Sequence, residues 1–265
     1  MSYWAERVAR AQDKLTDISV RRAELQLRRY YQRSMQNVLG EFEKTYNKLL
    51  SNIDEGRKPT PADLYKLDKY WQMQGQIKEE LRKLGEWEHV LLSNQFEKHY
   101  FDIYNSFAIP GKEAYTTVSK EAALQMINSI WCADGKTWSQ RVWNNMDYLQ
   151  HTLNESLIEC VVAGKKTTEL KRLLTGNFGV SYARADTLVR TEMAHIQTQA
   201  AKQRYEEYGL TEYEILGNDD DSCGSKAANC HELDGKRFKY AEMVAGVNAP
   251  PFHPNCKCCI VPVVE

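Results

Sequence analysis

The chain has 265 residues, of which 42% are hydrophobic, 11% aromatic and 27% charged. This apolar fraction lies well above that of disordered chains, so we expect one or two domains with a buried core. Thirty-five basic residues nearly balance 36 acidic ones, and the net charge of −1 excludes a strong global attraction to nucleic acid or anionic membranes. The sequence has neither a run of roughly 20 apolar residues nor the apolar segment of a secretory signal at its start, so we expect no membrane partner.

The first fifty residues predict one long helix, or two collinear ones. They contain no proline, their only glycine is Gly40, and apolar residues recur at intervals of four and three from Trp4 to Ile53. Polar residues interrupt this stripe, which is typical of a helix that packs through a narrow seam. At about 1.5 Å per residue the helix would reach roughly 75 Å, which is longer than a compact domain needs. We therefore expect residues 1–53 to form an association arm, including for self-association.

The sequence from residue 60 to residue 209 predicts shorter helices separated by turns. Thr60 is the expected N-cap of the first of these helices, and Gly85 is its expected stop. A further turn is expected at Gly176–Ser181, because two glycines lie close together there. The predicted helices cover residues 61–84, 86–107, 119–131, 137–162 and 168–174, and a last one ends near residue 208.

The character of the sequence changes after Leu210. Short segments there have the alternation or the β-branched content of strands, at residues 211–216, 235–240 and 258–264. The predicted fold class is therefore mainly α, with a long N-terminal helix and a helical body followed by a small α+β C-terminal domain. We expect three regions: a helical arm and hairpin at 1–109, a helical body at 110–210, and a cysteine- and histidine-rich terminal domain at 211–265.

Five of the seven cysteines lie between residue 223 and the end of the chain. A reducing compartment is expected, which disfavours disulfides and favours a metal site. Thiolate and imidazole groups on two loops can close a tetrahedral structural zinc site. On an extended backbone Cys259 points away from its neighbours and is assigned to the core. Five candidates remain for four positions around the zinc: Cys223, Cys230, His253, Cys256 and Cys258. The alternative is a small core of reduced thiols without metal.

The signatures of common enzymes are absent from the sequence or incomplete. His231 and Glu232 differ from the H-x-E pattern of zinc deaminases, and the cysteines that follow do not form P-C-x-x-C. His253 has no second catalytic histidine in a recognisable place, as an HNH-like nuclease would need. We therefore expect no catalytic residues and no enzyme. The helical histidines lack partners at metal spacing and are expected to be structural: His89, His99, His151 and His195.

A basic stretch in the first predicted helix is a candidate for contact with DNA. Its members are Arg21, Arg22, Arg28, Arg29 and Arg33. These side chains can neutralise a few phosphates, and the alternative is a solvated helix face balanced by neighbouring acids. We expect at most weak contact with DNA that does not depend on its sequence.

Several segments of the C-terminal half occur in an order that is found in a known family: Trp138–Trp143, Phe178–Ser181, Ala185–Ala194, Leu233–Phe238 and Pro251–Cys258. Together they resemble the tailed-phage head morphogenesis proteins, the minor head proteins similar to the phage Mu F protein. The resemblance covers about residues 110–265. Family members usually have Arg where this chain has Lys257, and often Cys-x-x-Cys where it has Cys223 and Cys230 with six residues between them.

The resemblance implies an assembly role and not catalysis. It implies a minor head (capsid) protein that binds near the portal protein and has other capsid components as partners. Some members of the family are also associated with DNA. It also implies assembly in the host bacterial cytoplasm and a final location in the head of the virion. The alternative function is a zinc-dependent DNA-binding protein or HNH-like nuclease.

Overall fold

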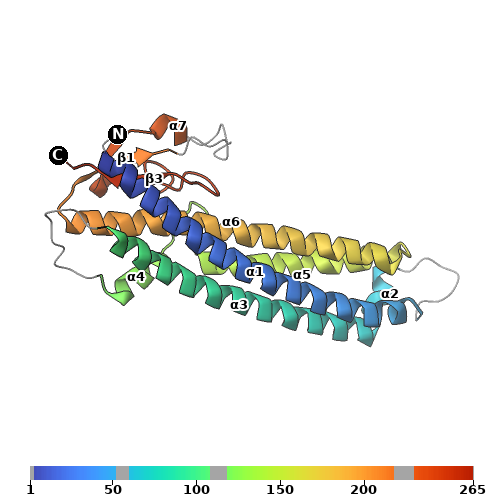
Figure 1. Ribbon diagram of the computed structural model, residues 1–265. Coiled ribbons are helices and arrows are strands. Elements are labelled where there is room, and N and C mark those ends of the chain that lie inside the picture. The colour runs from blue at the N-terminus through green and yellow to red at the C-terminus, as the bar shows by residue number, and fades with distance from the viewer. Residues whose placement is uncertain (1–2, 52–59, 108–117, 218–229, 265) are drawn as a thin grey trace. The chain divides into compact units, whose positions relative to one another are not determined.

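The computed structural model describes residues 3–51, 60–107, 118–217 and 230–264, and Figure 1 shows their arrangement along the chain. These residues are mostly helical and end in a small sheet, which confirms the predicted fold class. The helices are α1 Tyr3–Ser51, α2 Pro61–Tyr65, α3 Asp68–Ser106, α4 Lys120–Ile127, α5 Trp138–Val162, α6 Thr167–Glu207 and α7 Cys230–Leu233. The strands are β1 Glu212–Leu216, β2 Arg237–Lys239 and β3 Cys259–Pro262, with the short 3₁₀ helix η2 at Tyr240–Glu242.

The internal contacts divide the chain into two units. The first unit contains Met1–Glu24, Leu91–Ser139 and Thr187–Glu265, and the second contains Leu25–Val90 and Gln140–Asp186. The strands and the cysteine-rich region therefore all lie in the first unit. Each unit has its own buried core.

Helix α1 is continuous, as predicted, but it is not a free arm. In the first unit its Val20 and Ala23 are buried, and in the second unit its Leu27, Phe42 and Tyr46 are buried. The hydroxyl of Tyr46 also donates a hydrogen bond to the backbone carbonyl of another part of the second unit, at 2.9 Å. The narrow apolar stripe of α1 therefore packs within this chain, and association of residues 1–53 with a partner or a second copy stays a prediction.

Two predicted helix breaks at glycines are wrong. Gly85 lies inside α3, where a Cβ would come within 2.7 Å of Trp143 Cζ3 and 3.0 Å of Met146 Cγ. This glycine permits close approach between two helices and does not end one. Gly176 and Gly179 likewise lie inside α6. The predicted helix start at Thr60 is confirmed: its N–H donates to the Asp63 carboxylate at 2.9 Å, and α2 follows.

The three strands form an antiparallel sheet in the order β2-β1-β3. In the central strand Tyr213 and Ile215 are fully buried. The buried side chain of Gln12 in α1 donates to the carbonyl of Ile260 at 3.1 Å and to the hydroxyl of Tyr205 in α6 at 3.0 Å. These hydrogen bonds hold the sheet against helices of the first unit, so the loops beside it have a fixed support.

Candidate metal centre

Three of the five predicted ligands converge in the first unit. The sulfur atoms of Cys230 and Cys256 and a ring nitrogen of His253 all lie within 4.8 Å of one another. Cys230 begins α7, whereas the other two lie in the loop that leads to β3. Asn255, with φ 61°, gives this loop its tight turn, and the Cys256 N–H donates to the His253 carbonyl at 3.2 Å. Asparagine is one of the few residues that adopt this left-handed conformation readily.

The ring of His253 is held in the orientation that a metal ligand needs. Its Nδ1 lies 2.8 Å from the Pro254 carbonyl oxygen, so Nδ1 carries the proton and donates it there. Nε2 then keeps its lone pair, and this buried atom has no hydrogen-bond partner among the described residues. Metal-binding histidines are commonly fixed by such a bond from the second ring nitrogen.

Cys258 and Cys259 lie in different clusters, as the sequence predicted. Cys258 packs with Cys230, Cys256 and Phe252 in one buried cluster. Cys259 belongs to a different cluster, with Leu216 and Val261. Cys223 lies outside the described residues.

Electrostatics favour a thiolate in the first cluster. A hydrogen bond with Cys258 is the main cause that lowers the pKa of Cys256 to about 5, against the opposing effect of burial. The thiolate is the form of cysteine that binds metals. Burial instead raises the pKa of the Cys259 thiol. Cys230, His253 and Cys256 can therefore hold a metal ion, and two sulfurs with one imidazole nitrogen form a donor set that suits zinc.

A cleft of about 590 Å³ adjoins this cluster in the first unit. Its lining carries charges of both signs, including Asp13, Arg190 and Lys257. Burial, followed by the charge of Asp17, raises the pKa of Asp13 to about 6. Arg190 forms an ion pair with Glu24 of α1. The mixture of charges does not select an anion or a cation.

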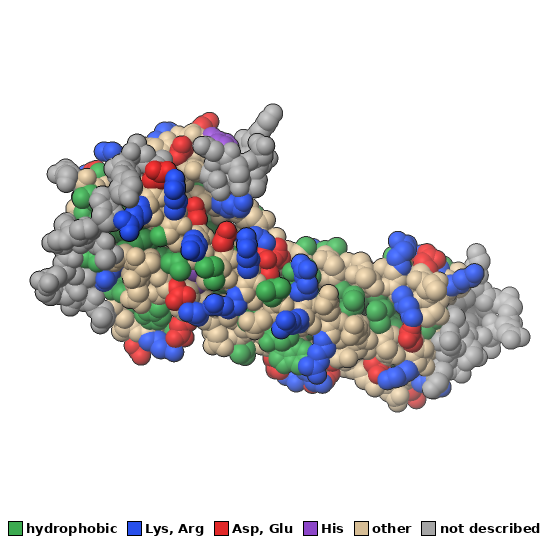
Figure 2. All heavy atoms as spheres, viewed as in Figure 1, with side chains coloured by type: hydrophobic (Ala, Val, Ile, Leu, Met, Phe, Trp, Pro, Cys, Tyr) green, Lys and Arg blue, Asp and Glu red, His purple; other side chains and the backbone are tan. Residues whose placement is uncertain are grey.

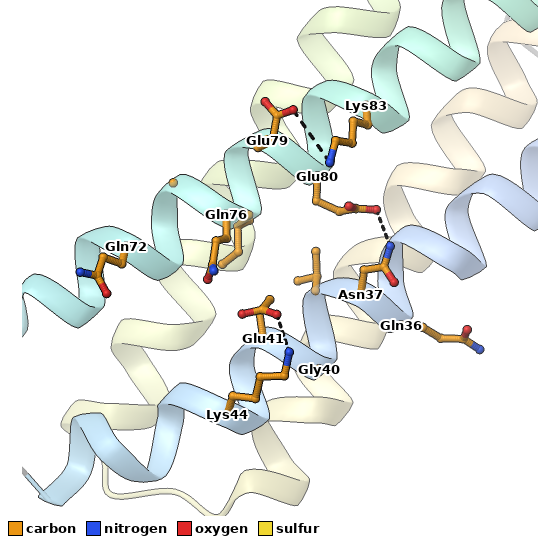
Figure 3. Close-up of a pocket in the computed structure, with 13 residues that line it drawn as sticks. Gln36, Asn37, Gly40, Glu41, Lys44, Gln72, Gln76, Glu79, Glu80 and Lys83 are labelled. Atoms are coloured by element: carbon orange, nitrogen blue, oxygen red, sulfur yellow. Dashed lines mark hydrogen bonds and ion pairs between the residues drawn. The ribbon is translucent and has the colours of Figure 1, made fainter.

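A second hollow, of about 810 Å³, lies between α1 and α3 in the second unit (Figure 3). Its charged side chains are paired among themselves: Lys44 with Glu41 at 2.8 Å, and Lys83 with Glu79 at 3.9 Å. The amide of Asn37 donates to Glu80 at 2.9 Å. These pairs satisfy the charges in the groove, so its lining does not indicate a particular ligand.

Two helical histidines lie in the core of the first unit. The ring nitrogens of His99 lie 3.2 Å from Ser19 Oγ and 3.2 Å from the Met193 carbonyl, and burial lowers its pKa to about 4. His195 stacks on Trp131 with a centroid distance of 4.4 Å, and burial lowers its pKa to about 3. Both rings are therefore neutral at physiological pH and serve in packing.

Two glutamate carboxyl groups are buried, and sequence reasoning missed the one of Glu88. Glu88 accepts a hydrogen bond from the Tyr31 hydroxyl at 2.8 Å, and Glu192 accepts one from the Trp131 indole at 2.9 Å. Glu88 lies four residues from each of the buried Leu84 and Leu92. This four-residue spacing is the sequence signal that places Glu88 on the core face of α3.

The five arginines proposed for DNA contact are all exposed. Two of them lie over aromatic rings of the second unit: Arg28 is 5.9 Å from the centroid of Tyr182, and Arg33 is 5.2 Å from that of Trp87. Basic and acidic side chains intermingle over the face seen in Figure 2. DNA contact stays a prediction.

Residues 151–261 match the family model described as Phage Mu protein F like protein. This span contains α6, β1, β2, most of β3 and the three converging ligands, so the resemblance is confirmed for the C-terminal part of the chain. No curated protein and no solved structure gives a significant match. Within the described residues, no helix has the length and apolar character that crossing a membrane requires.

Proposed function

We propose that the protein is a minor head component of a tailed phage and acts in head morphogenesis. The observation that carries this proposal is the match to the Mu F-like family over residues 151–261. Long helices and a small terminal sheet form a scaffold suited to binding other proteins. The role is structural and not enzymatic.

The portal protein and other capsid components are the proposed partners, and the virion head is the proposed location, after assembly in the host bacterial cytoplasm. The exposed arginines of α1 add at most weak DNA contact. The C-terminal region carries one structural zinc ion. Two of the converging ligands are buried cysteines, with exposures of 2% and 4%, which favours a structural ion over one that meets a substrate.

Co-expression with the portal protein of the same phage tests the proposal. We expect the two proteins to co-purify, and we expect the protein to be detected by mass spectrometry in purified heads. Failure of both measurements would overturn the proposed role. Cleavage of DNA on addition of a divalent metal would instead favour the alternative, an HNH-like nuclease.

A further inference from the structure

We propose that Cys230, His253, Cys256 and Cys258 together close a four-ligand zinc site, and that this site fixes the loop 251–258 against helix α6. The inference specifies the ligands and the mechanical role of the structural zinc in the proposed function. It does not depend on the protein being part of a phage head.

The three converging side chains leave one position of a structural zinc site to be filled. Cys230, His253 and Cys256 supply three donor atoms. Zinc with three protein ligands keeps an open position for water and is typical of catalytic sites, whereas structural zinc has four protein ligands. Both sulfurs are buried within the first unit. A fourth protein ligand is therefore needed for a closed structural site.

Cys258 is the residue that can supply this fourth ligand. Cys258 is 3% exposed and packs in the same cluster as the two other cysteines. Its thiol is the hydrogen-bond partner of Cys256. Its sulfur is not among the three atoms that lie within 4.8 Å of one another, so its side chain turns toward them when the ion binds. Two residues apart on an extended segment, Cys256 and Cys258 have side chains on the same side.

The imidazole of His253 also favours a bound ion. A buried ring nitrogen without a partner is costly, because buried polar atoms are nearly always hydrogen-bonded. In His253 the proton at Nδ1 is committed to the Pro254 carbonyl, and Nε2 is the buried atom without a described partner. A zinc ion satisfies this atom by accepting its lone pair.

The segment that carries the ligands also contacts helix α6 of the first unit. The N–H of Asn255 donates to the hydroxyl of Thr191 in α6 at 3.1 Å, from the middle of the segment that carries the ligands. The other ligand, Cys230, comes from α7. Zinc binding therefore ties α7 to the loop and holds the loop where it meets α6. Removing zinc should loosen residues 251–258 but leave the pairing of β1 with β2 and β3.

The test compares Cys258→Ser with Cys259→Ser in the full chain. The two cysteines are adjacent and both are 3% exposed, but they belong to different clusters, so each variant controls for the other. Zinc is quantified by elemental analysis, and its affinity is measured by competition with a chromogenic chelator. We expect one zinc per wild-type chain, a loss of affinity of about 100-fold or more in Cys258→Ser, and wild-type affinity in Cys259→Ser.

X-ray absorption on the wild-type protein gives the ligands directly and does not depend on a variant that folds. We expect three sulfurs at about 2.3 Å and one nitrogen at about 2.0–2.1 Å. Hydrogen exchange after chelation should rise in residues 251–258 and not in β1. Zinc bound by four sulfurs, or zinc lost from Cys223→Ser but kept by Cys258→Ser, would overturn the ligand set. A chain purified without chelator that holds no zinc would overturn the site itself, while the portal experiment tests the head role separately.

Discussion

At the scale of single residues, the second unit buries a carboxyl group without a described cation. Glu88 is fully buried and accepts a hydrogen bond from Tyr31, whose hydroxyl also accepts one from Asn145 at 3.0 Å. Burial raises the pKa of Glu88 to about 7, and the hydrogen bond from Tyr31 opposes this only in part. Glu88 Oε1 and Asn145 Oδ1 are both buried acceptors without partners among the described residues. A proton on Glu88 would remove the cost of burying its charge and would turn the unpartnered carboxyl oxygen into a donor.

The first prediction concerns the dependence of stability on pH. The pKa of the Glu88 carboxyl rises from its ordinary value of 4.5 in the unfolded chain to about 7 in the folded protein. The folded state holds this proton more tightly than the unfolded chain does, so protonation of Glu88 stabilises the fold. This stabilisation is complete below pH 4.5 and is lost as the pH rises to about 7, by about 3 kcal/mol in total. In Glu88→Gln we expect this loss to disappear, since the neutral amide still accepts the hydrogen bond from Tyr31 and does not titrate. Urea unfolding between pH 5 and pH 8 measures the slope.

Glu86→Gln is the matched control, because Glu86 lies on the same helix but is exposed. It should keep the wild-type slope. An equal slope in the wild type and in Glu88→Gln would show that Glu88 is ionised throughout.

The residue scale also shows what sequence can predict about a site. The opposite sides of Cys258 and Cys259 follow from the alternation of an extended backbone, and the structure confirms them. The convergence of Cys230 with His253 could not be derived, because it depends on how α7 and the loop before β3 fold back on the sheet. Glu88 was missed because an acidic residue within an apolar stripe is usually interpreted as exposed.

At the scale of secondary-structure elements, helix existence was predicted better than helix ends. Capping chemistry at Thr60 and Ser119 is local, and both helix starts are confirmed. Gly85 was interpreted as a helix end because glycine has a low helix propensity. Glycine inside a helix costs only about 1 kcal/mol relative to alanine. Packing against α5 outweighs a penalty of that size, and the sequence around Gly85 gives no sign of this contact.

The second prediction compares two glycines inside helices of the second unit. Gly85→Ala places a methyl group 3.0 Å from Cγ of the buried Met146, so we expect a loss of about 1–3 kcal/mol of stability. Gly40→Ala meets nothing within 4 Å, so we expect a gain of about 0.5–1 kcal/mol from helix propensity. Chemical denaturation of both variants measures the difference. Equal stabilisation by both would show that α3 and α5 do not need the close approach at Gly85.

At the scale of the whole molecule, the packing of α1 within its own chain is what the sequence did not predict. An apolar stripe with four- and three-residue spacing predicts a helix with one buried face, but it does not say whether the covering surface belongs to the same chain. The length of α1 favoured an external partner. The structure instead uses successive turns of this helix as core: Val20 and Ala23 in the first unit, and Leu27, Phe42 and Tyr46 in the second.

The last prediction follows from this use of α1. Deleting residues 1–50 removes core side chains from each unit, and each large one contributes about 1.5–3 kcal/mol by burial. Together they approach the 5–15 kcal/mol that stabilises a typical domain. The deletion also removes Gln12, the hydrogen-bond partner of Ile260 and Tyr205. We therefore expect the shortened chain to lack a cooperative thermal transition by circular dichroism and to aggregate in size-exclusion chromatography.

A double variant of exposed residues in the same helix, Arg21→Gln with Arg22→Gln, separates the loss of core from the loss of surface charge. Both side chains are exposed, so we expect this variant to keep the wild-type melting transition, within about 0.5 kcal/mol. A shortened chain that instead unfolds cooperatively as a monomer would show that the rest of each unit folds without α1. In that case α1 would be free to bind a partner, because its buried face would be dispensable for the fold.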